Sequence, residues 1–309
     1  MRQAFLRGLC DLASEDDRIV LLTGDLGYMA MEPFRDRFPK RFINAGVAEQ
    51  NMIGMATGMA EAGLRPYVYS IATFAALRPF EFIRNGPVLH HLPVRIVGMG
   101  GGFDYGHAGA THYAAEDIGV MRTLPGLAIV IPADSRQAAT ALRVTASIEG
   151  PVYYSLSRDD SQMAPNLDGR FDPGRIQIVR SGGDVALIGM GAISIEVAAA
   201  AEELSGSGIE ATVAIVSGFS PDPVNDISEL LSRFPFAVSV EAQTSSGGLG
   251  AFVSTVIATE GLACRLKMLA VSSSPDGTSG NQAERWRKYG LDRISIVRGA
   301  CALMGRTPR

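Results

Sequence analysis

Three polar segments of the sequence each follow an apolar run of the kind expected in a buried strand. They are 24–26 (GDL), 44–51 (NAGVAEQN) and the glycine-rich loop 98–113. In a parallel α/β sheet, ligands bind beyond the carboxyl ends of the strands, which is where these segments begin. Chemistry is therefore expected there first.

The second segment contains the most informative single residue, Glu49. It opens a predicted helix whose next residues, MIGMATGMA, are small and apolar enough to pack against a sheet. A carboxylate there would be held in a dry place. The alternative is a structural role, because an acidic residue in the first turn of a helix gains ~0.3–1 kcal/mol from the helix dipole. The residues alone leave both interpretations open.

The third segment, GMGGGFDYGHAGATHY, gathers glycines, histidines and aromatic residues in one long loop. Such a loop is costly to order and is uncommon unless it binds something, which favours a ligand-binding role. Alternatively, it is an irregular surface loop in which His107 is incidental and His112 lies near the start of a helix. The glycines at 98–102 do not follow the register of a dinucleotide-binding fingerprint, so no nucleotide site is inferred.

The elements that would position these residues are predicted from apolar runs that alternate with helical stretches. Continuous apolar runs separated by helices indicate parallel sheets covered on both faces. The fold class is therefore α/β with two doubly wound domains: a mainly parallel-sheet domain at 1–160, a polar linker at 161–182, and a smaller α/β domain at 183–309. Strands of the first domain are expected at 19–23, 42–45, 66–69, 94–98, 127–131 and 152–156, and helices at 48–62, 74–90 and 135–148.

The overall composition is that of a globular protein. The chain has 309 residues, of which 47% are hydrophobic and 19% charged, and its net charge is −4. Lys and Arg are scattered, so nucleic acid and membrane surfaces are poor partners. The three cysteines are too widely spaced to indicate a zinc site or a disulfide framework. The first residues lack the apolar region of a signal peptide, and no apolar run approaches 18 residues, so we expect a cytoplasmic protein that does not span a membrane.

From 46 to 74 (GVAEQNMIGMATGMAEAGLRPYVYSIATF) the sequence resembles the pyrimidine-binding domain of transketolases. The resemblance covers nearly the whole chain. Each later matching motif is weak evidence alone, but together, in this order and spacing, the motifs are specific for the family. They are R-N at 84–85, G-A-T-H at 109–112, P-A-D at 132–134, L-S-R at 156–158, G-G-L-G at 247–250 and Y-G-L-D at 289–292. The resemblance implies a member of the transketolase family that includes a C-terminal domain after the linker.

The resemblance also implies a cofactor site for thiamine diphosphate. Glu49 matches the family's catalytic glutamate, which bonds N1′ of the aminopyrimidine ring and so activates the cofactor. Phe74 matches an aromatic residue that packs on this ring, and Phe80 is expected to help. Two residues of the first polar segment, Asp25 and Leu26, complete the expected cofactor-binding set.

A substrate site follows from the same resemblance. His112 matches a histidine that faces the substrate near its reactive carbon, and His107 lies in the same loop. Arg2 and Arg158 resemble the family's phosphate-binding arginines, and a guanidinium fork suits a phosphate or another tetrahedral anion. Four positions depart from the family pattern: Met29, Leu77, Gly100 and Ala108 stand where a serine, an aromatic residue, a histidine and an aspartate are usual. We therefore expect ketol transfer with a non-standard small-molecule substrate.

The expected partner follows from a missing motif. Transketolase-like enzymes hold the cofactor's diphosphate and its Mg²⁺ on a separate domain, through G-D-G followed by an asparagine, and this sequence has no such pattern. An N-terminal transketolase-like subunit should carry that site, and the resemblance implies an α2β2 assembly. We expect the chain to transfer a two-carbon ketol unit between a ketose-type donor and an aldehyde acceptor only together with that subunit.

Three alternatives stay open. The β subunit of a 2-oxo-acid dehydrogenase first component has the same layout and glutamate, although the A-E-Q-N and G-A-T-H sequences favour a transketolase. A deoxyxylulose-phosphate-synthase-like activity is a weaker choice, since that enzyme is normally one chain. A non-catalytic regulatory subunit is the alternative from a different class, and the retained Glu49, Phe74 and His112 argue against it.

Overall fold

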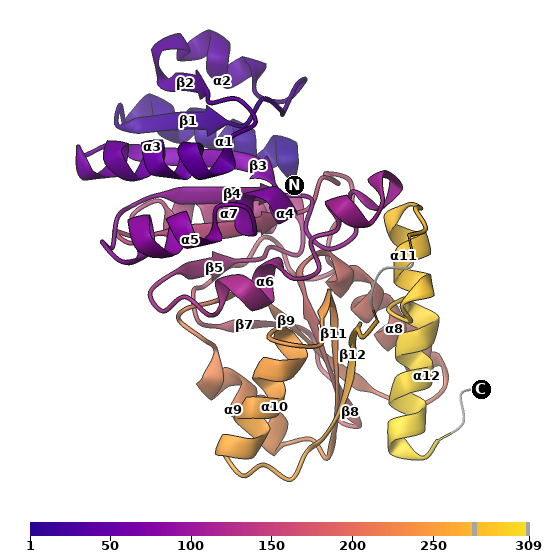
Figure 1. Cartoon of the computed structure of the whole chain (residues 1–309). Helices are drawn as coiled ribbons and strands as arrows, with labels where there is room; N and C mark the ends of the chain where they lie inside the picture. The colour runs from indigo at the N-terminus through magenta and orange to yellow at the C-terminus, as the bar shows by residue number, and fades with distance from the viewer. Residues whose placement is uncertain (274–276, 307–309) are drawn as a thin grey trace.

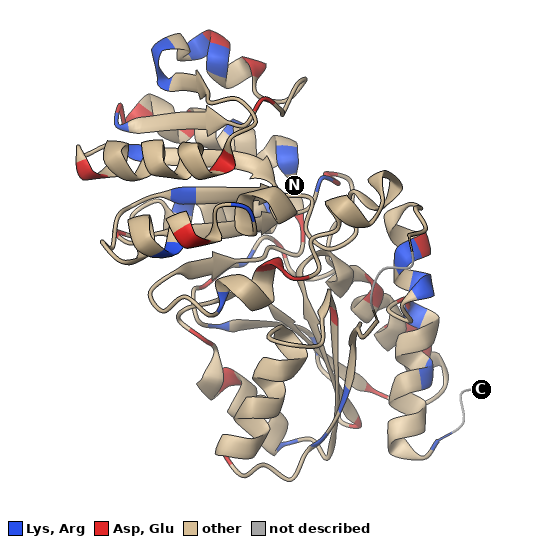
Figure 2. Ribbon diagram, viewed as in Figure 1, with Lys and Arg blue, Asp and Glu red and all other residues tan. Residues whose placement is uncertain are grey.

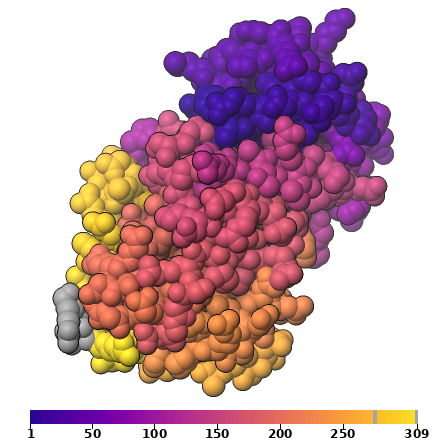
Figure 3. Space-filling view, turned by 180° about the vertical axis from the view of Figure 1, so that it is seen from behind, coloured from indigo at the N-terminus to yellow at the C-terminus, as the bar shows by residue number. Residues whose placement is uncertain are grey.

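The structure is a computed structural model that describes residues 1–273 and 277–306. Two β-sheets, each covered by helices, form the two halves of the molecule and lie end to end (Figure 1). Seen from behind, the half with the first sheet sits directly on the other half (Figure 3). The predicted α/β fold class with two mainly parallel sheets is confirmed.

The first sheet has seven strands in the order β10-β5-β6-β4-β3-β1-β2. All neighbours are parallel except β10, which pairs antiparallel with β5. Because helices cover both faces, strands such as β1, β4 and β6 are buried along their whole length, and this explains their continuous apolar sequences. The strands are β1 (Ile19–Thr23), β2 (Phe42–Asn44), β3 (Arg65–Ile71), β4 (Arg95–Met99), β5 (Ala128–Val130), β6 (Val152–Leu156) and β10 (Gly218–Phe219).

Helices α3 and α5 cover one face of the first sheet, and α1 and α7 cover the other (Figure 1). Each long helix buries one apolar stripe with helical spacing; in α3 this stripe contains Met52, Ile53, Ala56 and Ala60. The helices of this half are α1 (Arg2–Glu15), α2 (Glu32–Arg37), α3 (Glu49–Glu61), α4 (Ala72–Ala76), α5 (Phe80–Ile83), α6 (Asp117–Met121) and α7 (Ser135–Thr145).

The second sheet has five strands in the order β12-β11-β8-β9-β7, and only β7 is antiparallel to its neighbour. Helices α9 and α10 pack on one face, and α8 and α12 pack on the other (Figure 1). Its strands are β7 (Ile176–Arg180), β8 (Val185–Met190), β9 (Ala211–Val216), β11 (Phe236–Thr244) and β12 (Arg265–Val271). Its helices are α8 (Ser194–Gly206), α9 (Val224–Ser232), α10 (Leu249–Thr259), α11 (Gln282–Lys288) and α12 (Arg293–Met304).

The single helix predicted at 74–90 is wrong. The chain forms α4, α5 and a π-helical turn, η2 (Arg84–Val88), in its place. Pro79 and Pro87 explain the difference, because proline lacks the backbone N–H of a continuous helix and its ring clashes with the preceding turn. In addition, β7 lies inside the stretch predicted to be a linker, where it forms an edge of the second sheet.

Two features join the halves. β10 follows β9 in the chain, but it extends the first sheet by pairing with β5. Arg122, just after α6, donates hydrogen bonds to the carbonyl oxygens of Gly247 and Gly248 at 2.7 and 3.1 Å, and its guanidinium lies over the Phe219 ring. The two sheets are therefore cross-connected by both backbone and side-chain contacts.

Charged residues of both signs are scattered over both halves of the chain (Figure 2). This mixture matches the dispersed Lys and Arg residues of the sequence. None of the helices in the described ranges is both long enough and apolar enough to cross a membrane.

Candidate active site

Glu49 is the first residue of α3, and only 2% of it is exposed. Oγ of Ser70, near the end of β3, lies 3.4 Å from Oε1 of Glu49. A Cβ atom built on Gly24, directly after β1, would lie 3.9 Å from the same oxygen. Segments near the carboxyl ends of neighbouring parallel strands therefore meet at this carboxylate. Glu49 is in the dry place that its sequence context predicted.

The main partner of Glu49 is Arg78, which the sequence analysis did not identify. Nη1 of Arg78 donates to both carboxylate oxygens, at 2.9 and 3.0 Å. The guanidinium carbon also lies 3.7 Å from the centre of the Phe74 ring. A lone arginine in the apolar stretch ATFAALRPF was the available signal, but the partner is 29 residues away and spacing does not reveal it. The buried carboxylate is thus paired with a cation, as burial of a charge requires.

Phe74 and His112 lie side by side at this site. Their ring centres are 5.2 Å apart, and the rings are inclined at 64°. Nδ1 of His112 is 2.9 Å from Oγ1 of Thr111, so the neighbouring hydroxyl orients the imidazole. Phe80, the other aromatic candidate, packs against the apolar core of the first sheet. The structure therefore places Phe74, and not Phe80, on the face of the Arg78 guanidinium.

Asp25 and Leu26 lie in the loop that follows β1. The carboxylate of Asp25 accepts hydrogen bonds from Nδ2 of Asn44 at 2.9 Å and from the hydroxyl of Tyr28 at 3.0 Å. These two bonds hold the pKa of the exposed Asp25 carboxyl below its usual range. The carbonyl of Leu26 accepts from Oγ1 of Thr23 at 2.9 Å. Asp25 therefore fixes the shape of this loop, and half-buried Leu26 lines a cavity of about 130 Å³ beside it.

A second group of side chains surrounds Tyr105, in the loop that follows β4. The Arg158 guanidinium carbon lies 4.4 Å from the Tyr105 ring centre, and the ring centres of His107 and His112 lie 6.2 and 6.4 Å from it. Burial raises the pKa of Tyr105, whereas the positive charges of nearby Arg158 and Arg2 oppose that rise. The structure thus gathers the four predicted substrate residues around a tyrosine that the sequence analysis overlooked.

Arg2 and Arg158 have unused hydrogen-bonding capacity. The Nε atom of each is buried and has no hydrogen-bond partner among the residues that the structure describes. Buried donors are normally paired, so a bound anion would complete both side chains. Tyr105 also accounts for one departure from the family pattern: a Cβ atom on Gly100 would lie 2.3 Å from the tyrosine ring, which leaves no room for a histidine.

A buried acid supports the loop from below. Asp117 is fully buried and accepts hydrogen bonds from the hydroxyls of Tyr153 and Ser155 at 2.7 and 2.9 Å. Burial raises the pKa of Asp117 to about 6, although the hydrogen bonds act to lower it. A Cβ atom on Gly101 would lie 2.6 Å from Oγ of Ser155, so the loop backbone rests directly on this network.

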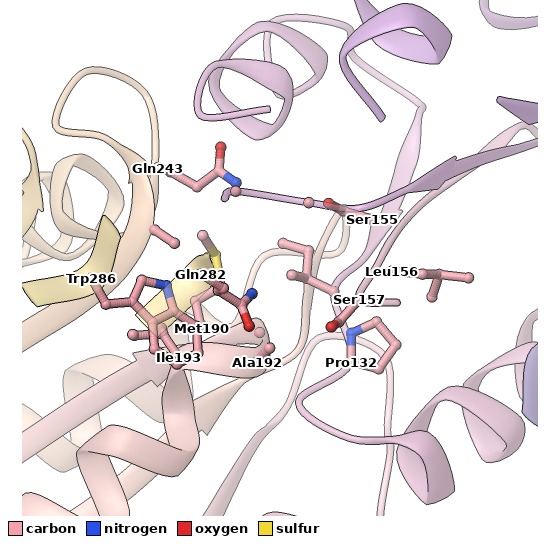
Figure 4. A pocket seen from close by; sticks show the side chains of 15 residues that line it. Pro132, Ser155, Leu156, Ser157, Met190, Ala192, Ile193, Gln243, Gln282 and Trp286 are labelled. Atoms are coloured by element: carbon pink, nitrogen blue, oxygen red, sulfur yellow. The ribbon is translucent and has the colours of Figure 1, made fainter. Parts of the chain in front are cut away.

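A cavity of about 40 Å³, lined by residues of both halves, lies next to Gly101 and Gly102. Figure 4 shows side chains that line it. Two of its lining atoms, Nε1 of Trp286 and Oε1 of Gln243, are buried without a hydrogen-bond partner within the described ranges. A polar cavity of this size holds a few water molecules, and it is too small for an organic cofactor.

The side chains at and near Glu49 offer a carboxylate, an aromatic face and an imidazole. This donor set suits a flat nitrogen heterocycle, which can stack on the aromatic ring and hydrogen-bond to the carboxylate in its own plane. The planar guanidinium of Arg78 already makes both kinds of contact. In the described part of the chain, no group of three His, Cys, Asp or Glu side chains is arranged to hold a metal ion.

Comparisons with known proteins agree with this geometry. Residues 1–163 match the family model described as transketolase, pyrimidine binding domain, and residues 174–296 match that of the transketolase, C-terminal domain. The chain is 35% identical to a putative transketolase C-terminal section of Methanocaldococcus jannaschii, over 96% of this chain and 94% of that protein. It is 30% identical to an apulose-4-phosphate transketolase subunit of Actinobacillus succinogenes (93% and 92% covered) and 32% identical to a 6-deoxy-6-sulfo-D-fructose transketolase subunit of a Clostridium species (97% and 93%).

A solved structure supports the same conclusion. The fold matches that of a split gene transketolase, an inactive beta4 tetramer, with a TM-score of 0.89 and 32% identity, and the match covers 100% of this chain and 99% of that one. The sequence-based recognition is therefore confirmed over both halves of the molecule. With its pyrimidine-binding and C-terminal domains, the chain belongs to the transketolase family.

Proposed function

We propose that this chain is the pyrimidine-binding subunit of a two-chain, thiamine-diphosphate-dependent transketolase. The reaction is the transfer of a two-carbon ketol unit from a ketose-type donor to an aldehyde acceptor. When bound, the cofactor supplies the carbon nucleophile that takes up and releases this unit. The main support for the proposal is the buried Glu49 carboxylate beside the Phe74 ring. One planar group, the Arg78 guanidinium, contacts both of them.

The residues of this chain have separate roles in the proposal. Glu49 holds and releases a proton at the ring nitrogen of a bound aminopyrimidine, and its burial keeps water from competing for that proton. Phe74 offers its face to the same ring. His112 lies beside Phe74 and hydrogen-bonds to substrate oxygen atoms at the reacting carbon.

Arg2 and Arg158 support a substrate with an anionic end. Each has a buried Nε atom without a hydrogen-bond partner among the described residues, and the Arg158 guanidinium carbon lies 4.4 Å from the Tyr105 ring centre. A guanidinium binds the oxygens of a tetrahedral anion well. Two relatives are named for sugars that carry a phosphate or a sulfo group, apulose-4-phosphate and 6-deoxy-6-sulfo-D-fructose. We infer that the donor or the acceptor of this enzyme also carries a phosphate or a sulfonate.

The proposal assigns the diphosphate and the Mg²⁺ of the cofactor to an N-terminal transketolase-like partner, in an α2β2 assembly. Relatives that are named as a C-terminal section or as one subunit of a transketolase support such a division into two chains. The solved relative is described as a β4 tetramer that is inactive, which fits a chain that needs a different subunit for activity.

Calorimetric titration of thiamine diphosphate with Mg²⁺ tests the proposal. The titration is made into this chain alone, into the partner alone, and into their mixture, and tight binding is expected only in the mixture. Tight binding to the lone chain would contradict the shared site, and no binding in any arm would favour a non-catalytic subunit. Mass-spectrometric detection of two-carbon transfer between phosphorylated or sulfonated sugars then tests the reaction itself.

A further inference from the structure

We propose that Arg78 is an internal ligand of the pyrimidine pocket and must leave the pocket before the cofactor enters. The inference rests on the proposed function, because it concerns the same pocket. It adds a residue that sets cofactor affinity and that neither the family models nor the names of the relatives point to.

The two contacts of Arg78 define the pocket that it fills. Its Nη1 atom donates to both oxygens of Glu49, at 2.9 and 3.0 Å. Its guanidinium carbon lies 3.7 Å from the centre of the Phe74 ring, which is the separation of two groups in van der Waals contact. The guanidinium therefore lies on the aromatic face and bonds to the buried carboxylate at the same time.

An aminopyrimidine ring would use the same two anchors. Like a guanidinium, it is flat and has a nitrogen-carbon-nitrogen unit whose edge hydrogen-bonds to a carboxylate while its face stacks on an aromatic ring. At a separation of 3.7 Å, no second flat group fits between Arg78 and Phe74. Occupation of the pocket by Arg78 and occupation by the cofactor ring are thus mutually exclusive.

Arg78 is able to leave without disturbing the fold. In the lone chain its side chain is 41% exposed, whereas the Glu49 side chain is 3% exposed, so the guanidinium lies on the outer side of the carboxylate. Among the described residues, the hydrogen bonds of its guanidinium all go to Glu49. The residue stands just before Pro79, between α4 and α5, and belongs to neither helix. Its release therefore removes two contacts and leaves the backbone as it is.

The expected consequence is a loss of apparent affinity. When a binding site is open for only a fraction of the time, the apparent dissociation constant rises by the inverse of that fraction. If Arg78 is out of the pocket about a tenth of the time, its removal tightens cofactor binding about tenfold.

Calorimetric titration of thiamine diphosphate with Mg²⁺ into the two-chain complex tests the inference. Arg78→Met is expected to bind about tenfold more tightly than the wild type. Arg78→Lys keeps a cation near Glu49 but cannot stack as a plane, so its affinity is expected between the two. The matched control is Arg298→Met, an exposed arginine in α12, which should bind as the wild type does.

A second experiment adds methylguanidinium, which mimics the end of the arginine side chain. It distinguishes a block of the pocket by Arg78 from an effect of the substitution on Glu49 itself. In an Arg78→Ala complex, millimolar methylguanidinium should refill the pocket and weaken cofactor binding again, whereas it should have little effect on the wild type. The inference would be overturned if the wild type and Arg78→Met bound the cofactor equally tightly, or if methylguanidinium had no effect on Arg78→Ala. In either case, binding of the cofactor by the complex would still support the proposed function. If no complex binds the cofactor, the proposed function fails, and the inference fails with it.

Discussion

Replacement of Glu49 by glutamine isolates the proton-transfer role that we propose for this residue. Glutamine keeps the size and planar shape of the side chain but cannot take up a proton. Because Glu49 is 2% exposed, bulk water cannot serve in its place. The nearest hydroxyl, that of Ser70 at 3.4 Å, is far too weak a base to substitute for a carboxylate.

The size of the effect follows from these contacts. Proton transfer by a positioned side chain contributes about 10²–10⁴-fold to a rate, which corresponds to a barrier change of about 3–5 kcal/mol. Since the Ser70 hydroxyl cannot replace the carboxylate, we expect a fall in kcat of about 10³-fold. Folding should be little affected, since the half-exposed Arg78 can return to water and glutamine needs no cationic partner.

Steady-state kinetics of the two-chain complex measure this effect, with calorimetry to show that the variant still binds the cofactor. Glu61→Gln is the matched control, because Glu61 ends the same helix and is exposed, and its kcat should equal that of the wild type. If the Glu49→Gln complex binds the cofactor and keeps most of the wild-type kcat, the reasoning about Glu49 is refuted.

Three further predictions concern the substrate site and stability. Arg158→Met should raise KM for a phosphorylated or sulfonated substrate about 10–100-fold, from the loss of a charge-assisted hydrogen bond, and should change KM for the uncharged analogue much less; equal changes for both would contradict anion binding. Arg95 is 1% exposed and donates to the carbonyl oxygens of Gly150 and Ala146 at 2.8 and 3.2 Å, and to that of Ile148. Arg95→Met should therefore lower the free energy of unfolding by about 3 kcal/mol in urea denaturation, and an unchanged midpoint would refute this. Since burial raises the pKa of Asp117 from 3.8 to about 6, the folded state binds this proton more tightly, and its contribution to stability is lost as the pH rises from about 4 to about 6. Asp117→Asn should remove up to about 3 kcal/mol of that pH dependence, and an identical pH profile would show that burial of Asp117 has no such effect.

The sequence predicts those parts of the fold that depend on local pattern. β1, β4 and β6 are continuous apolar runs because both faces of the sheet are covered, and their positions agree with prediction to within a residue or two. The helix predicted at 74–90 is not continuous because Pro79 and Pro87 each lack the backbone N–H donor that a regular helix requires.

In the candidate site, the sequence predicts Glu49 but not Arg78 or Tyr105. Glu49 was found because its burial follows from the residues that come after it in the same helix. Arg78 and Tyr105 were missed because their roles depend on side chains that meet across the fold: Arg78 reaches Glu49 over 29 positions, and Tyr105 covers Gly100 and lies against Arg158. Spacing along the chain gives no measure of such contacts.

The pairing of β10 with β5 has a mechanical consequence. A protease cut in the segment between β6 and β7 would not release two free fragments, because the later fragment supplies an edge strand to the earlier sheet and Arg122 clamps the same junction. The nicked protein should run as one species in gel filtration and separate only in denaturant. The two halves are therefore braced against rotation relative to one another by a backbone pairing and by the Arg122 side chain.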